Sequence, residues 1–378
     1  EYRRLMAKAI HEAHDGCLYT SNHSWRFRSK DPRDVPEFVD TISGDLSHGP
    51  ALRMTRLSGM QISPETRVPT DIMHNIMNVS HGKRQSVSLR RIEQMGGLTF
   101  AAGGAWFLWV PGSTIVQKDV QERARHCADF AQARKRALGK TTSLNSVAVL
   151  LSEASWHRDM VAGVKGSYDT TNSENLALAL QDAGYGVDMP NEDILRDQLD
   201  HYRVVFIVNQ HVVADVTRVA LDRFVRGGGT LVVLGTGLAA MPDVCDLLGV
   251  RLIAGEHPVR QLQTADGGLL PVPADYLCQP LSAHVLAEFD DGTPALMARS
   301  VERGRIAYVA CPTVSYPDET ALAAWLMRTL GLGPQVALGG GTDGMHLLFS
   351  QRRNGSAVII HITDLASRVN GRPVEAAQ

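Results

Sequence analysis

The sequence predicts an α/β protein with two dissimilar α/β segments followed by the start of a β-domain. Three observations support this fold class. Short apolar runs alternate with longer stretches of helical periodicity, which is the pattern of βα units. Several of the apolar runs are continuous and β-branched, as expected for parallel strands covered on both faces. Near the C-terminus the pattern changes to alternation around Asn354-Gly355, which is typical of a β-hairpin.

The first segment, residues 1–140, indicates consecutive βα units. Helices are expected at residues 2–14, 50–60, 86–95 and 116–138, and strands at residues 16–20, 38–43, 68–73 and 98–102. His, Asn, Asp or Trp follows these strands. Four such units correspond to the C-terminal half of a (β/α)8 barrel, whose active site forms at the carboxyl ends of its strands. Half a barrel leaves sheet edges open, so we expect this chain alone to be poorly soluble or inactive.

The second segment, residues 145–333, indicates a flavodoxin-like or glutamine-amidotransferase-like domain. Strands are expected at residues 147–151, 187–190, 202–208, 230–234, 295–299 and 306–310, and helices at residues 174–182, 212–226, 243–248 and 319–330. The glycines at 227–229 precede a strand and no Lys follows them, so they are expected to end a helix and not to bind phosphate. No structure is predicted for the Gly/Pro/Asp-rich residues 255–294. Residues 334–378 are expected to begin a C-terminal β-sandwich.

Composition excludes several classes of protein. The formal net charge of -2 favours neither nucleic acid nor an anionic membrane as a partner. The five cysteines are widely spaced, without a CxxC pair or zinc-type spacing, so we expect no disulfide framework, no metal site and no cofactor. No apolar run is long enough to span a bilayer. The chain starts at Glu1 without an initiator Met, so a cytoplasmic and a secreted location both stay open.

The second segment offers no convincing nucleophile. A reactive Cys or Ser would be expected at the turn after residues 230–234, but this turn is Gly235-Thr236-Gly237. The nearby Cys245 falls inside an expected helix. We therefore expect a structural or assembly role for this segment.

The first segment is richer in chemistry. Glycoside hydrolysis needs two carboxylates flanking the scissile bond, and Asp45 and Asp71 lie at or near expected strand ends. Amide and imidazole groups can bind sugar hydroxyls, and an indole face can cover the apolar face of a pyranose. The candidate substrate-binding residues are Asn22, His23, Trp25, His74, Asn75, Trp106 and Trp109. A structural interpretation stays open, with Asp45 capping a helix near Pro50 and the tryptophans in the core.

Four stretches of the second segment resemble the β-galactosidase trimerisation domain of family 42 glycoside hydrolases. They are VAVLLS (147–152), the helix at 175–184, YRVVFIV (202–208) and FVRGGGTLV (224–232). This domain has an amidotransferase-like fold without amidotransferase chemistry. The resemblance implies a homo-oligomer, with a trimer as the first choice.

The first segment is more similar to the second half of the barrels in α-L-fucosidase-like hydrolases that carry the same middle domain. The matching stretches are FVDTISGD (38–45), PTDIMHN (69–75) and GGLTF (96–100). This resemblance implies a retaining glycosidase acting on oligosaccharides or glycans, whose nucleophile is an Asp upstream of Glu1. Asp71 is the strongest positional match, as an acidic residue that contacts substrate.

Two alternatives stay open. A β-galactosidase would use two Glu residues on the barrel, but Glu37, Glu65 and Glu93 fall between the expected strands. A non-catalytic carbohydrate-binding or assembly protein would have lost its barrel acids. In each case the expected ligand is a carbohydrate.

Overall fold

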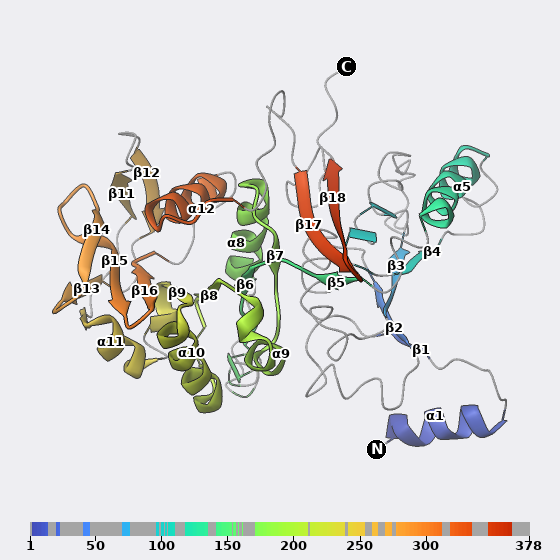
Figure 1. Cartoon of the computed structure of the whole chain (residues 1–378), viewed down its shortest axis with the longest axis horizontal. Helices are drawn as coiled ribbons and strands as arrows, with labels where there is room; N and C mark the ends of the chain where they lie inside the picture. The colour runs from blue at the N-terminus through green and yellow to red at the C-terminus, as the bar shows by residue number, and fades with distance from the viewer. Residues whose placement is uncertain are drawn as a thin grey trace. The chain divides into compact units, whose positions relative to one another are not determined.

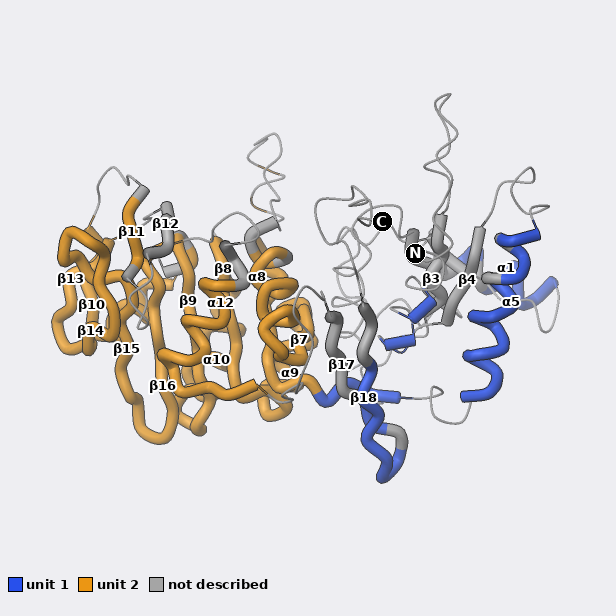
Figure 2. Tube along the Cα trace, turned by 90° about the horizontal axis from the view of Figure 1, so that it is seen from above, with its two compact units in different colours: residues 1–144, 341–378 blue, residues 145–340 orange. Residues whose placement is uncertain are grey.

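A computed structural model of the chain forms two compact units, which Figure 2 shows in different colours. Unit 1 comprises Glu1–Leu144 with Gly341–Gln378, and unit 2 comprises Asn145–Gly340. The residues that the structure describes are 2–13, 20–22, 41–45, 70–75, 96–97, 100–101, 103, 105–109, 118–134, 141–152, 154–155, 158, 161, 171–210, 212–238, 241–253, 259–263, 269–273, 277–311, 318–334 and 347–364. The expected helices at 50–60 and 86–95 lie outside them.

The first sheet of unit 1 contains β1 (Thr20–Asn22), β2 (Thr41–Asp45), β3 (Thr70–Asn75) and β4 (Ala105–Trp109). The strands are parallel and adjacent in chain order. Helix α1 (Tyr2–Ala13) precedes them and α5 (Lys118–Ala133) follows. Consecutive βα units produce this order, so the predicted α/β class is confirmed.

The strand expected at residues 98–102 is wrong. Phe100 and Ala101 are helical, and the strand is β4 instead. Gly103 has φ +77° and its N–H bonds the carbonyl of Phe100 at 3.0 Å, which ends the helical turn. A short apolar run suits a helix as well as a strand, and here the glycine that follows it decides.

A second sheet of unit 1 contains the predicted hairpin. β17 (Leu347–Asn354) and β18 (Ala357–Asp364) are antiparallel, and β17 also pairs with β5 (Thr142–Ser143). Arg352 of β17 is fully buried, and its Nε donates to Oγ1 of Thr141 at 2.7 Å. A Cβ at Gly103 would lie 2.6 Å from Nη2 of Arg352. The buried guanidinium therefore connects β17 to the turn that precedes β4.

The main sheet of unit 2 has the strand order β14-β15-β16-β9-β8-β6-β7. Five of these strands, from β16 to β7, are parallel, and β14 and β15 are antiparallel. All five residues of β8 are buried, as its β-branched sequence predicts. The strands are β6 (Val147–Val149), β7 (Val187–Asp188), β8 (Val204–Val208), β9 (Thr230–Leu234), β14 (His284–Glu288), β15 (Pro294–Val301) and β16 (Gly304–Val309).

Helices connect the parallel strands of unit 2 (Figure 1). α8 (Thr171–Asp182) packs beside α12 (Asp318–Thr329), and α9 (Glu192–Asp197) packs beside α10 (Asp215–Gly227). Right-handed crossovers through this strand order put the first and last helices on one face and the middle helices on the other. This doubly wound arrangement is flavodoxin-like. Two further elements follow β9, the 3-10 turn η3 (Gly235–Leu238) and helix α11 (Pro242–Leu248).

Four further strands of unit 2 fall in or beside the stretch for which the sequence predicted no structure. β10 (Val250–Ile253) pairs with β13 (Leu277–Pro280), and β11 (Val259–Gln263) pairs with β12 (Leu269–Pro273). These are short antiparallel ribbons outside the main sheet. β10 and β13 are separated by residues 254–276, so their pairing left no local signature.

Candidate functional site

The four parallel strands of unit 1 each end on a residue that the sequence singled out. β1 ends at Asn22, β2 at Asp45, β3 at Asn75 and β4 at Trp109. These four residues are called the strand-end set below. The carboxyl ends of barrel strands are where active sites form, so this set is the candidate functional site.

The register of the strands puts the whole set on one face of the sheet. Asn22 pairs with Ser43, two residues before Asp45. Asp45 pairs with Met73, two residues before Asn75, and Asn75 pairs with Trp109. Paired residues in a parallel ladder share a face, and so do residues two apart on one strand. Asn22, Asp45, Asn75 and Trp109 therefore share one face of the sheet at its carboxyl end.

The same register indicates that the strand ends lie near one level. Asn22 pairs with Ser43, so β2 ends two residues beyond the end of β1. Asp45 pairs with Met73, so β3 ends two residues beyond the end of β2. Asn75 pairs with Trp109, so β4 ends level with β3. In a closed barrel of eight strands with a shear of 8, positions at the same height along the barrel axis are offset by about one residue from the paired position on each next strand. The observed offsets average slightly more than one, as expected for the mouth of a barrel.

The other candidates occupy different places. Asp71 is the second residue of β3, in the row of Ser43 and Ala105. The sequence placed it near a carboxyl end because His74 and Asn75 were assigned to a loop. Pairing with β4 extends the strand through both of them, so Asp71 lies near the amino end.

His74 and Trp106 belong to the opposite face of the sheet. His74 pairs with Leu108, and Trp106 pairs with Ile72, in rows that alternate with those of the strand-end set. His23 and Trp25 lie outside the described residues. A period-two pattern in the sequence would have separated the two faces, but only with the strand boundaries known.

In unit 2 the carboxyl ends of β6 and β8 are joined by hydrogen bonds between protein groups. The hydroxyls of Ser152 and Ser155 donate to the carbonyl of Val212 at 2.8 and 2.7 Å, and Ser152 Oγ lies 2.9 Å from Oε1 of Glu192. Burial raises the pKa of Glu192, against the opposing effect of the Ser152 hydrogen bond. Ligands of doubly wound sheets bind where the strand order reverses, between these two strands. Here protein groups bridge that position.

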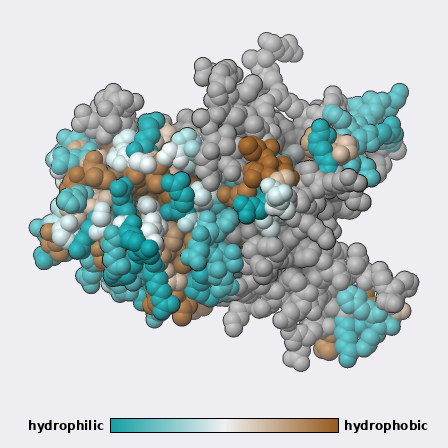
Figure 3. Space-filling view, in the orientation of Figure 1, coloured by the Kyte–Doolittle hydropathy of each residue, from teal (hydrophilic) through white to brown (hydrophobic). Residues whose placement is uncertain are grey.

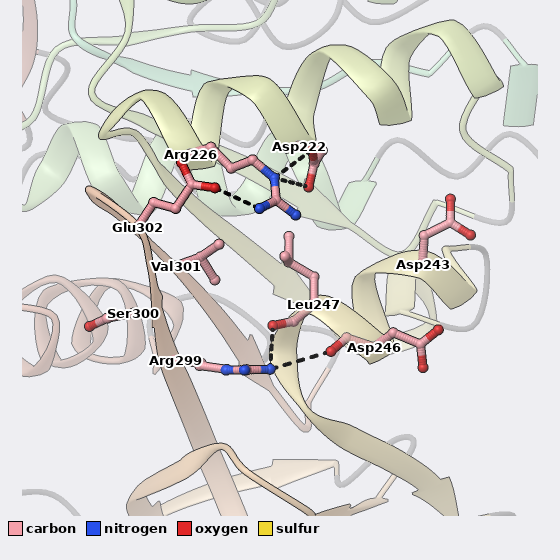
Figure 4. A pocket seen from close by; sticks show the side chains of 9 residues that line it. All are labelled: Asp222, Arg226, Asp243, Asp246, Leu247, Arg299, Ser300, Val301 and Glu302. Carbon is pink, nitrogen blue, oxygen red and sulfur yellow. Dashed lines mark hydrogen bonds and ion pairs between the residues drawn. The ribbon is translucent and has the colours of Figure 1, made fainter.

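A groove of about 580 Å³ in unit 2 is lined by charged side chains from α10, α11 and β15 (Figure 4). Nε of Arg226 is 2.8 Å from Asp222 and its Nη1 is 2.7 Å from Glu302. These hydrogen bonds, with that to Asp222 the largest influence, raise the pKa of Arg226. Arg299 donates to the carbonyl of Leu247 at 3.2 Å. Both guanidinium groups are thus held by groups of the protein itself.

The described part of the chain contains no cluster of three or more His, Cys, Asp or Glu side chains suited to a metal ion. None of its helices is both long and apolar enough to cross a membrane. On the face of unit 2 seen in Figure 3, hydrophilic and hydrophobic residues are interspersed. The strand-end set is therefore the strongest candidate.

Comparisons with known proteins agree on the fold. No protein-family model and no curated protein sequence matches the chain. Among solved structures, a cold-adapted β-galactosidase from Rahnella sp. R3 is 17% identical with a TM-score of 0.71, over 95% of this chain and 60% of that one. A GH42 β-galactosidase from G. stearothermophilus is 15% identical with a TM-score of 0.69, over 93% and 59%. α-L-Fucosidase isoenzyme 2 from Paenibacillus thiaminolyticus is 14% identical with a TM-score of 0.66, over 94% and 58%.

These likenesses establish the fold of the chain. Each similar structure covers nearly all of this chain, whereas this chain spans about 60% of the length of those proteins. The mixed α/β architecture with parallel sheets thus matches that of barrel glycosidases of known structure.

Proposed function

We propose that the protein is a glycoside hydrolase whose substrate binds at the strand-end set. The observation that carries this proposal is the shared face and level of Asn22, Asp45, Asn75 and Trp109. Fold similarity to β-galactosidases and a fucosidase supports it. Amides and a carboxylate can bind sugar hydroxyls, and an indole can stack on a sugar ring.

The composition of the two faces supports assigning the strand-end face to the barrel interior. Besides Met73 and Phe107, that face also carries the polar residues Thr41, Ser43 and Asp71, whereas the opposite face carries Ile42, Ile72, Trp106 and Leu108 beside Thr70 and His74. The outer face of a barrel packs against apolar helix faces, and the mouth of its interior binds the substrate. The polar face therefore suits the interior.

An α-L-fucoside is the preferred substrate, because the barrel strands resemble those of α-L-fucosidase-like hydrolases in sequence. A β-galactoside is the second candidate, since β-galactosidases are prominent among the similar structures. The resemblance to fucosidases favours retention of the anomeric configuration. Both substrates would bind through the same hydroxyl-binding and stacking groups.

The proposal is tested with the full-length protein on 4-nitrophenyl α-L-fucopyranoside and 4-nitrophenyl β-D-galactopyranoside. Hydrolysis of either glycoside, measured by release of nitrophenol, is the expected result. Binding of the free sugars by calorimetry without turnover of any aryl glycoside would contradict an enzyme and favour a carbohydrate-binding protein.

The two tryptophans of β4 provide a matched pair of variants. Trp109→Ala removes the indole at the strand end and should raise KM about tenfold, equivalent to about 1.4 kcal/mol of binding energy, with a smaller change in kcat. Trp106→Ala alters the opposite face. It should lower the melting temperature and change KM less than Trp109→Ala does. Steady-state kinetics and thermal denaturation of both variants check this. A larger KM effect in Trp106→Ala would reverse the assignment of the two faces.

A further inference from the structure

We propose that the outer face of α10 in one copy of the chain docks against the edge strand β14 of a second copy. Both elements belong to unit 2, so this contact does not depend on the proposed glycosidase function. It also goes beyond the resemblance to a trimerisation domain, which names no surface. The number of copies in the assembly is left to measurement.

Helix α10 exposes two valines on its outer face. Its buried residues are Thr217, Leu221 and Val225, and the helix packs against β9 and β16. Val216 and Val219 are 62% and 52% exposed. They lie three residues apart, so they share one side of the helix. The outer face of α10 therefore presents apolar surface to solvent.

Charged residues of opposite sign flank these valines. Asp215 precedes them and stays largely exposed, although it forms an ion pair with Arg218 of the same helix. Arg223 follows them and is exposed. It lies four residues after Val219, on the same side of the helix. Along α10 the order is thus acidic, apolar, apolar, basic, over a length of about 12 Å.

Strand β14 carries a matching order. It lies at the edge of the main sheet, where β15 is its neighbour. Val285 and Leu286 are 36% and 42% exposed. The exposed His284 precedes them, and the exposed Glu288 follows them. Along β14 the order is imidazole, apolar, apolar, carboxylate, over a length of about 13 Å.

The two elements are complementary in length and in charge. Aligning them from their amino ends puts the carboxylate of Asp215 beside the imidazole of His284. The same alignment puts the guanidinium of Arg223 beside the carboxylate of Glu288, with the apolar pairs between. The reverse alignment brings the two carboxylates together at one end. Opposite charges favour a contact and like charges oppose it, so one direction is preferred.

A second copy of the chain supplies the partner of each element. Within one chain α10 packs against β9 and β16, whereas β14 pairs with β15 at the sheet edge. Figure 1 shows α10 and β14 as separate parts of unit 2. One kind of contact between copies covers the exposed apolar pairs of both elements. Repeated in a closed assembly, it covers every α10 and every β14.

Pairing of like elements is the rival arrangement. Two antiparallel α10 helices would also bring opposite charges together, but they would leave β14 uncovered. Two antiparallel β14 strands would likewise bring His284 near Glu288. However, the register of β14 against β15 shifts between Val285 and Ala287. Such a bulge bends an edge strand and hinders the addition of another strand, whereas a docked helix needs no regular ladder.

The contact should depend on ionic strength. Its four exposed apolar side chains cover less surface than a standard interface, which buries about 800 Å² per partner. The charge pairs at its two ends therefore contribute a large share of the affinity. Exposed charge pairs are screened by salt, so association should weaken between about 50 and about 500 mM NaCl.

Charge exchange in the full-length protein tests the contact. Arg223→Glu and Glu288→Arg each put like charges against the other copy, so each should raise the dissociation constant of the assembly about tenfold. The double variant R223E/E288R restores opposite charges and should return the dissociation constant to near the wild-type value. Arg125→Glu makes the same charge change at an exposed position of α5 in unit 1, and as the control it should have no effect. Sedimentation velocity over a series of protein concentrations measures these constants.

The pattern of effects separates the arrangements. Dissociation by Arg223→Glu alone would indicate pairing of two α10 helices, and dissociation by Glu288→Arg alone would indicate pairing of two β14 strands. Either result would overturn the proposal, as would a folded double variant that does not reassociate. A wild type that stays monomeric at micromolar concentration would also overturn it. Both substituted positions are exposed, so thermal denaturation followed by circular dichroism should give each variant the wild-type melting temperature.

Discussion

The histidine of β18 shows how one buried residue links the stability of unit 1 to pH. His361 lies diagonally from Arg352 on the paired strands, because Arg352 pairs with Ile359, two residues away. Burial, and secondarily the charge of Arg352, lowers the pKa of His361 from 6.5 to about 4. The native state therefore holds a neutral imidazole where the unfolded chain would take up a proton.

This shift predicts a loss of stability in mild acid. A lowered pKa in the folded state contributes stability above the unfolded value of 6.5, and this contribution is lost as the pH falls from 6.5 toward about 4. Between pH 7 and pH 5 the loss should reach up to about 2 kcal/mol, and His361→Gln should reduce it. Urea denaturation at both pH values checks the prediction. His284→Gln, at an exposed position of β14, is the control. An equal pH effect in wild type and His361→Gln would refute it.

At the scale of elements, the end of α10 and the start of β16 meet at glycines. Gly228 has φ +119° and caps α10, as the sequence predicts for the triple glycine. Gly304 begins β16 beside this cap, and a Cβ there would lie 1.9 Å from the carbonyl oxygen of Val225. The helix end and the strand are thus in backbone contact.

Substitutions at two of these glycines should differ in effect. Gly304→Ala would force backbone atoms apart and should lower the free energy of unfolding by at least about 2 kcal/mol. Gly227→Ala, where an added Cβ meets no atom within 4 Å, should be neutral or slightly stabilising. Denaturant titration of both variants provides the measurement. Equal stability of the two variants would show that the strand shifts at little cost.

For the whole molecule, the resemblance of unit 2 to a trimerisation domain predicts a closed homo-oligomer. Identical head-to-tail interfaces must close to avoid filaments, and the resemblance alone makes a trimer the first expectation. Light scattering coupled to size-exclusion chromatography of the full-length protein should give three times the protomer mass. A monomer at micromolar concentration would remove the assembly role of this unit.

Features that depend on short stretches of sequence were predictable. The buried β-branched strand β8, the glycine cap of α10 and the turn at Asn354-Gly355 follow from periodicity, backbone conformation and turn chemistry. The residue types of the strand-end set were also identified, because polar and aromatic residues after apolar runs are visible without a structure. These signals are local, so they need no knowledge of what packs against them.

The grouping of those residues depended on contacts between distant parts of the chain. The register from β1 to β4 put Asn22, Asp45, Asn75 and Trp109 on one face and left Asp71 below them. The ribbon β10–β13 likewise forms by pairing across residues 254–276. A shift of one residue in register moves a residue to the other face of a sheet. Register is set by hydrogen bonds between strands far apart in sequence, and no local pattern carries that information.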